Sequence, residues 1–114
     1  MNIEELAKLI EGEIVVRGTE EYEITHGFTS DLMSDVLTIN KQENTILLTG
    51  LANIQTIRTA EMANLNFIIL TRGKKATAEM IEIANENDIV IVESKYSAFR
   101  ASAVLFNAGI KFLY

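Results

Sequence analysis

The sequence predicts an α/β fold of three layers, in which helices cover both faces of a mainly parallel sheet. Three apolar segments begin at Ile46, Ile68 and Ile89, 22 and 21 residues apart, and a helical stretch follows each. This spacing suits a strand, a crossover helix and the next parallel strand, and is too long for a hairpin. The segments are continuous apolar runs without alternation, which is typical of strands covered on both faces.

The composition predicts one globular domain over residues 1–114, with 48% hydrophobic and 23% charged residues. The absence of cysteine excludes disulfides and thiolate metal sites. A net charge of −6 makes general nucleic-acid binding unfavourable, and no apolar run approaches the roughly 18 residues of a membrane span. Residues 1–9 lack the basic and apolar regions of a signal peptide. We therefore expect a cytoplasmic domain with neither a nucleic acid nor a membrane as partner.

The N-terminal part predicts a helix and a short hairpin. Residues Ile3–Ile10 carry one apolar stripe at helical spacing, and Gly12 is a plausible helix stop. Ile14–Val16 and Tyr22–Thr25 are short strand candidates separated by a turn at Gly18. We expect these two strands to pair as a hairpin beside the main sheet.

A second helix is predicted to begin at Ser30. Its hydroxyl suits an N-cap, and Asp31 in the first turn suits the positive end of the helix dipole. The helix would end near Leu37, and Asn40–Asn44 is predicted to be a polar connection.

Three strand–helix units follow. The predicted strands are Thr45–Thr49, Phe67–Thr71 and Ile89–Val92, and the predicted helices are Asn53–Asn64, Ala76–Asn87 and Ser97–Ala108. The first two helices both contain Thr-Ala-Glu-Met, which indicates a repeated architecture but no activity.

The last of these helices and the end of the chain are rich in apolar side chains. Phe99 and Phe106 lie seven residues apart, which predicts that both point into the core. Ile110–Tyr114 is a candidate last strand, and its apolar residues predict burial in the core or in a dimer interface.

The predicted ligand site lies at the carboxyl ends of the parallel strands, where open α/β sheets bind ligands. Glycine would let the backbone approach a ligand, hydroxyls and basic side chains would bind an anion, and helix N-termini would add N–H groups. The candidate residues are Thr49, Gly50, Asn53, Thr71, Arg72, Gly73, Lys74 and Ser97. The alternative is that glycine, threonine and serine stand there only because turns favour them.

A possible polar cluster comprises Ser30, Asp31 and Asp35. The two carboxylates lie four residues apart on one predicted helix face, where they could perform acid–base chemistry or hold Mg²⁺. Helix capping and one surface acid are the simpler explanation of the two carboxylates. An Mg²⁺-dependent enzyme is thus a third functional hypothesis.

Nucleophilic and metal catalysis are not indicated. His26 is the only histidine, so neither a histidine-rich metal site nor an oriented Ser–His–acid triad is expected. Gly73-Lys74-Lys75 does not complete a P-loop, because Ile68 replaces the first glycine and Lys75 the hydroxyl residue. We expect a protein that is not an enzyme and has no cofactor or metal.

Several segments together resemble the DRTGG domain, a module related to the N-terminal domain of HPr kinase/phosphorylase. The resemblance runs over nearly the whole chain, and its most specific part is the run Ser30-Asp31-Leu32-Met33-Ser34-Asp35. The other segments are Ile3–Ile10 with Gly12, Gly27–Val36, Thr49-Gly50, Leu70–Lys74 and Tyr96–Phe99. The family string itself is not intact, because Gly50-Leu51-Ala52-Asn53-Ile54 lacks its acidic residue and arginine. A ligand site that depends on those two residues is then altered or absent here.

The resemblance implies a stand-alone regulatory module that self-associates as a homodimer and has no kinase activity. Our first hypothesis is therefore a regulatory or ligand-sensing module for a small anionic metabolite or nucleotide. The second is a protein-interaction or assembly module without a small ligand. The apolar C-terminus and the seven glutamates among the first 23 residues favour this second hypothesis, since they offer surfaces to protein partners.

Overall fold

The computed structural model describes residues 1–39 and 44–114, and it confirms the predicted fold class. A six-stranded sheet has the order β1-β5-β4-β3-β2-β6, parallel throughout except for β1. The strands are β1 (Glu13–Val16), β2 (His26–Thr29), β3 (Thr45–Thr49), β4 (Phe67–Leu70), β5 (Val90–Glu93) and β6 (Lys111–Phe112). The helices are α1 (Ile3–Leu9), α2 (Met33–Val36), α3 (Ile54–Met62), α4 (Ala78–Glu86) and α5 (Ala98–Asn107).

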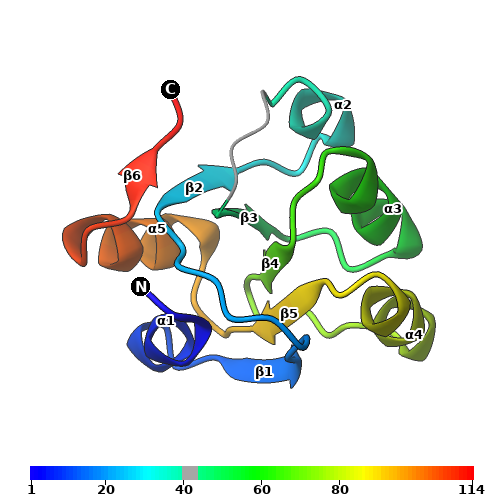
Figure 1. Cartoon of the computed structure of the whole chain (residues 1–114). Helices are drawn as coiled ribbons and strands as arrows, with labels where there is room; N and C mark the ends of the chain where they lie inside the picture. Colours follow the sequence, from blue (N-terminus) through cyan, green and yellow to red (C-terminus); the bar gives the residue numbers. More distant parts are fainter. Residues whose placement is uncertain (40–43) are drawn as a thin grey trace.

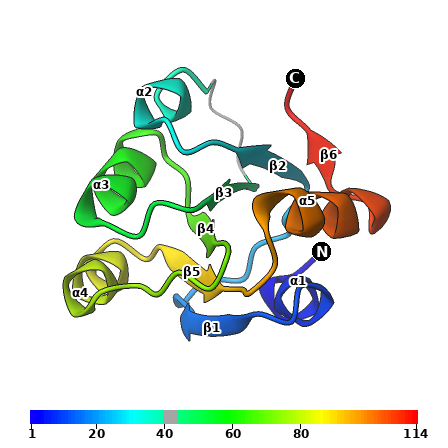
Figure 2. The same cartoon turned by 180° about the vertical axis from the view of Figure 1, so that it is seen from behind.

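Helices cover both faces of the sheet. Figures 1 and 2 show α1 and α5 on one face and α2, α3 and α4 on the other. Successive side chains of a strand point to opposite faces, so β3 contributes Ile46 and Leu48 to the α1–α5 core and Leu47 to the α2–α4 core. All five residues of β3 are buried, which explains its unbroken apolar sequence. No helix among the described residues is both long and apolar enough to cross a bilayer.

The three strand–helix units lie side by side and run the same way. Strand β4 pairs in parallel with β3 on one side and with β5 on the other. Asn53 caps α3 by accepting a hydrogen bond from the backbone N–H of Thr56. Ser97 caps α5 by accepting one from the backbone N–H of Arg100. The capping side chains supply acceptors for N–H groups that the first helical turn leaves unpaired.

The two Thr-Ala-Glu-Met strings occupy unlike positions. Thr59–Met62 forms the end of α3, and Thr59 is buried there. Thr77, by contrast, is the N-cap of α4, and its hydroxyl accepts a hydrogen bond from the N–H of Met80. The two strings are therefore not equivalent parts of a structural repeat.

The predicted hairpin is wrong. β1 pairs antiparallel with β5 at one edge of the sheet, whereas β2 lies between β3 and β6 towards the other edge. The chain between them crosses the α1–α5 face without forming a strand, and it buries Ile24 in that core. The Ile24 N–H bonds to the Met1 carbonyl at 2.7 Å. Pairing of β1 with the open edge of β5, and burial of Ile24 beneath α1, are thus more stable than a hairpin across the turn at Gly18.

The predicted helix start at Ser30 is also wrong. Helix α2 begins at Met33, and its N-cap position, Leu32, makes no side-chain capping bond. The Ser30 hydroxyl instead accepts a hydrogen bond from the Leu32 N–H at 3.0 Å and stabilises the preceding turn. Of the polar connection predicted at 40–44, only Asn44 lies among the described residues.

The aromatic residues near the C-terminus lie outside this chain's core, contrary to the prediction for Phe99 and Phe106. Phe99 is 87% exposed and Phe106 is 56% exposed, because α5 faces the sheet with Ala101 and Leu105 instead. The last strand does form, as the two-residue β6, but Phe112 is exposed as well. Tyr114 is likewise exposed, whereas Ile110 is buried in the core and Leu113 is partly buried against the α2–α4 core.

Candidate functional site

The carboxyl edge of the sheet brings most of the predicted site residues together. Gly50, Thr71 and Ser94 directly follow or end the neighbouring strands β3, β4 and β5. The Thr71 N–H bonds to the Thr49 carbonyl at 3.0 Å, so the parallel pairing continues to the strand ends. Arg72 and Lys74 are exposed at the same edge. The prediction that these strand ends share one edge of the sheet is therefore confirmed.

An internal carboxylate occupies the end of β3. Asp31, in the loop after β2, accepts hydrogen bonds from the Thr49 hydroxyl at 2.9 Å and from the Gly50 N–H at 2.7 Å. These are the groups that the sequence assigned to an external anion. Asp31 accepts both of these bonds, whereas Asp35 takes part in neither. Among residues 1–39 and 44–114, no group of three or more His, Asp or Glu side chains could hold a metal ion.

The loop after β4 uses its own N–H groups internally. Arg72 and Gly73 both have positive φ, of 58° and 72°. This conformation directs the Arg72 N–H to the Tyr96 carbonyl at 2.8 Å and the Gly73 N–H to the Ser94 carbonyl at 2.9 Å. These bonds join the loops after β4 and β5, whose helices leave to opposite faces of the sheet. An anion at this edge would therefore be bound by side chains, since these two amides already have acceptors.

Charges of both signs line the edge near β5. Glu93 is buried, and its carboxylate accepts a hydrogen bond from the Ala76 N–H at 2.7 Å and pairs with Lys75 at 3.3 Å. Tyr96 donates its hydroxyl to Glu11 at 2.6 Å, and this bond raises the pKa of Tyr96. These carboxylates offset part of the positive charge at this edge, so the edge attracts an anion less strongly than its basic residues alone would.

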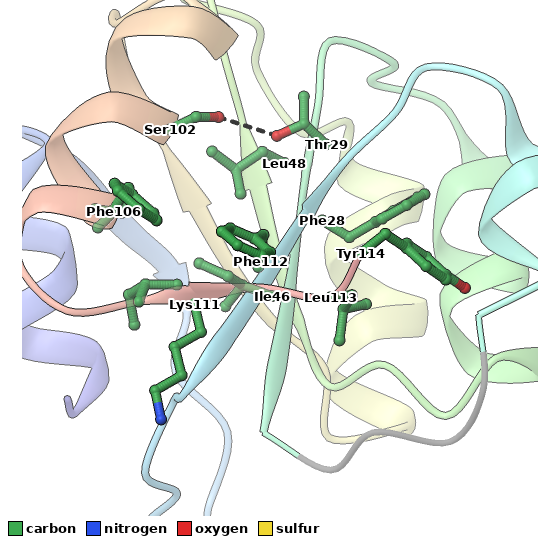
Figure 3. A pocket seen from close by; sticks show the side chains of 13 residues that line it. Phe28, Thr29, Ile46, Leu48, Ser102, Phe106, Lys111, Phe112, Leu113 and Tyr114 are labelled. Atoms are coloured by element: carbon green, nitrogen blue, oxygen red, sulfur yellow. Dashed lines mark hydrogen bonds between the residues drawn. The ribbon is translucent and has the colours of Figure 1, made fainter.

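An apolar pocket lies towards the other side of the sheet from β5, where β2 meets α5 and β6. Its volume is about 330 Å³. Ile46, Leu48 and Leu105 belong to the core beneath it, whereas Phe28, Phe106, Phe112 and Tyr114 supply aromatic walls (Figure 3). The remaining lining residues are Gly27, Thr29, Ser102, Ile110, Lys111 and Leu113.

Two features of the strands open this pocket. β6 pairs with β2 only through Lys111 and Phe112, so the chain leaves the sheet before the carboxyl end of β2. Gly27 has no side chain with which to fill the space between β2 and its neighbours Ile46 and Ile110. The C-terminal residues then line the space with aromatic rings, where Phe106 stacks on Phe112 with centroids 5.9 Å apart.

The polar groups of the pocket are few. The Thr29 and Ser102 hydroxyls bond to each other at 3.0 Å at one end of the pocket, and Figure 3 shows the Lys111 ammonium extending away from the aromatic side chains. A mostly apolar pocket with a small number of polar groups is typical of small-molecule sites. Sequence reasoning missed this pocket. The available signal was a glycine in a strand together with aromatic residues near the chain end.

Comparisons with known proteins support the fold. The chain is similar to the crystal structure of the CBS and DRTGG domains of the regulatory region of Clostridium perfringens pyrophosphatase, which was determined with its activator, diadenosine tetraphosphate. The TM-score is 0.69 at 16% sequence identity, and the match covers 90% of this chain and 45% of the other. No protein-family model matches the chain. No curated protein sequence matches it either.

The likeness shows that this chain has a fold found in a regulatory region that contains a DRTGG domain. At this level of identity it shows the fold alone. Membership of the DRTGG family, and a single DRTGG-like domain over residues 1–114, stay predictions from the sequence.

Proposed function

We propose that the chain is a cytoplasmic, non-catalytic regulatory module that responds to a small ligand. The observation that carries this proposal is the pocket between β2, α5 and β6, with its volume of about 330 Å³ and its aromatic walls. This volume lies at the lower end of the range of about 300–1,000 Å³ for ligand pockets. The ligand that suits it is a planar, mainly apolar ring, since such a ring can stack on Phe106 or Phe112.

The chemistry of the pocket favours binding over catalysis. Its lining residues include no Asp, Glu, His or Cys that could act as a general base or a strong nucleophile. The Thr29 and Ser102 hydroxyls have each other as partners and no neighbouring base in the pocket lining. They can instead orient a polar group on the edge of a bound ring.

An anionic ligand of the nucleotide class could use this pocket and the carboxyl edge together. Thr29 is the last residue of β2, so the end of the pocket that Thr29 lines lies at the carboxyl edge of the sheet. Arg72 and Lys74 follow β4, which lies two strand spacings away, or about 10 Å. A ring in the pocket could thus carry its phosphate groups towards these side chains. The nucleotide activator in the similar regulatory region supports this class of ligand.

Calorimetry and thermal unfolding with adenosine, AMP and inorganic phosphate separate the ring from the anion. We expect adenosine and AMP to bind and phosphate alone to bind weakly. A ligand at 100 times its Kd should add about 2.7 kcal/mol to the free energy of unfolding. The absence of any stabilisation by the two ring compounds would contradict a nucleotide ligand in this pocket.

Two matched variants locate the ring. Phe106→Ala should weaken binding of adenosine by about tenfold or more, because stacking on one aromatic side chain contributes about 1–3 kcal/mol. Phe99→Ala is the control, since Phe99 lies on the same helix, outside the pocket. Arg72→Ala should weaken AMP and leave adenosine unchanged. Equal effects of the two phenylalanine changes would place the ligand elsewhere.

A second candidate is an assembly module that forms a homodimer without a small ligand. The observation that favours it is the exposure of Phe106, Phe112 and Tyr114 around one edge of the sheet. Large exposed apolar patches mark interaction sites in folded proteins. Light scattering on the purified chain tests it. A strictly monomeric protein that captures no partner would exclude this candidate.

A further inference from the structure

The outward face of α5 carries an unpartnered row of apolar side chains. Phe99, Ala103 and Phe106 follow the i, i+4, i+7 spacing that places residues on one helix face. All three are exposed, Phe99 to 87%. Phe112 of β6 extends the row, because it stacks on Phe106 and is itself exposed. The opposite face of α5 already packs on the sheet, so this row is not needed for the core.

The nearest charged side chain does not cover this row. Arg100 holds its guanidinium 3.9 Å from the centroid of the Tyr96 ring, and Tyr96 is fixed by its hydrogen bond to Glu11. A cation over an aromatic ring is stabilised by the ring's electron density. The apolar row therefore stays accessible beside a guanidinium that already has a partner.

We propose that this row binds the same row of a second copy of the chain, with the two α5 helices antiparallel. The inference rests on the assembly candidate and names its surface, which shares Phe106 and Phe112 with the wall of the ligand pocket. Phe99 and Ala103, which are central to it, do not line that pocket.

The distribution of charge favours a second copy at this face. Residues 94–114 contain Lys95, Arg100 and Lys111 but no Asp or Glu, although the chain has 16 acidic residues and a net charge of −6. Two copies repel each other overall, and a symmetric contact brings like surfaces together. This segment itself therefore adds no carboxylate to a contact between two copies.

The spacing of side chains fits two-fold symmetry. The midpoint of the row lies between Ser102 and Ala103, and Phe99 and Phe106 each stand 3.5 residues from it, or about 5 Å along the axis. In an antiparallel pair, Phe99 of each copy then meets Phe106 of the other. The small side chains at the centre allow the helix axes to approach to about 8 Å.

The exposed area is sufficient to form the centre of an interface. Phe99, Phe106 and Phe112 are exposed to 87%, 56% and 67%, which together amounts to on the order of 400 Å². A standard interface buries about 800 Å² on each partner, with aromatic side chains at its centre and polar groups at its rim. The three rings supply about half of that area.

Light scattering over a range of concentrations tests the surface on the full chain. We expect a dimer for the unchanged protein and a dimer dissociation constant at least tenfold higher for Phe99→Glu. Met62→Glu is the matched control, because Met62 is also a largely exposed apolar residue, 70% against 87% for Phe99, and lies on α3 at the other face of the sheet. A monomer at all concentrations would overturn both the assembly candidate and this inference. A dimer that Phe99→Glu leaves intact would overturn the inference alone.

Disulfide cross-linking tests the antiparallel arrangement, and the chain has no cysteine to interfere. Ala103→Cys places the thiols of the two copies beside the symmetry axis, so mild oxidation should give a covalent dimer. Phe99→Cys places them about 10 Å apart along the axis and should not cross-link. Cross-linking of Phe99→Cys as fast as Ala103→Cys would contradict the arrangement, as would the absence of cross-linking in Ala103→Cys.

Discussion

The carboxylate of Asp31 accepts a hydrogen bond from the Thr49 hydroxyl at 2.9 Å and so joins the loop after β2 to the end of β3. The Gly50 N–H donates to the same carboxylate oxygen at 2.7 Å. An internal anion thus takes the position at this strand end that open α/β folds often offer to a ligand. A ligand that needed the Thr49 and Gly50 groups would first have to displace Asp31.

Replacing Asp31 by alanine should therefore destabilise the fold. The change removes both hydrogen bonds to a charged acceptor, and we expect a loss of about 1–2 kcal/mol in the free energy of unfolding, measured by denaturant titration. Asp35→Ala is the control, since the Asp35 carboxylate makes no hydrogen bond within the described residues, and its effect should stay within about 0.5 kcal/mol. Equal losses in the two variants would show that the Asp31 contacts contribute nothing specific.

Two glycines should respond in opposite ways to alanine. A Cβ at Gly12 would lie 2.6 Å from Cγ1 of Val92, so Gly12→Ala should displace α1 from β5 and cost about 1–3 kcal/mol. A Cβ at Gly27 would meet Ile110 and Ile46 at 3.4 and 3.5 Å, which is ordinary contact. Gly27→Ala should thus stabilise the strand by up to about 1 kcal/mol. Thermal unfolding measures the stability of both variants. If Gly27→Ala were less stable than the unchanged protein, the space next to β2 would be too small for a methyl group.

A buried hydroxyl without a partner makes Thr45 a site for stabilisation. Thr45 is 1% exposed, and its hydroxyl has no hydrogen-bond partner among the described atoms. Thr45→Val keeps the shape and removes the unsatisfied group, which should raise the free energy of unfolding by about 1 kcal/mol.

Thr56→Val is the contrasting control for that experiment. The Thr56 hydroxyl is also buried, but it donates to the Leu51 carbonyl at 2.7 Å. Its loss should lower the free energy of unfolding by about 1–2 kcal/mol. If both valine variants were less stable, the Thr45 hydroxyl would have a partner in solution.

The hydroxyl of Tyr22 should lose its proton only in strong alkali. Its hydrogen bond to Glu20 is the main cause that raises the pKa of Tyr22 to about 12, with burial and the negative charge of Glu20 acting in the same direction. Tyrosinate absorbance during an alkaline titration, compared with that of Tyr22→Phe, isolates this residue. Glu20→Gln should lower the pKa of Tyr22 towards its ordinary value of about 10.

The same shift has a consequence for stability. Because the folded state holds the Tyr22 proton more tightly than the unfolded state, its contribution is complete below about pH 10. It declines as the pH rises through about 12, the pKa in the folded state. Unfolding measured across this window should show a steeper decline for the unchanged protein than for Glu20→Gln. Parallel declines would contradict the role of the Glu20 contact.

The sequence by itself determined the three parallel strand–helix units. Continuous apolar strands and the spacing of Ile46, Ile68 and Ile89 are local properties of the chain, and the capping residues Asn53 and Ser97 act within one helical turn. These signals depend on backbone geometry and hydrophobic periodicity, so they can be evaluated without knowing what lies nearby. They also located the carboxyl edge, because parallel strands necessarily end together.

Only the tertiary structure decided which neighbours the remaining segments found. β1 pairs with β5, which lies far from it in the sequence and offers an open strand edge. The segment after β1 does not pair with it, because that segment buries Ile24 in the α1–α5 core. The spacing of Phe99 and Phe106 showed that they share a helix face but not which face meets the sheet. The apolar pocket exists because β6 leaves β2 after two residues. Each of these outcomes depends on competition between distant surfaces, which no local pattern records.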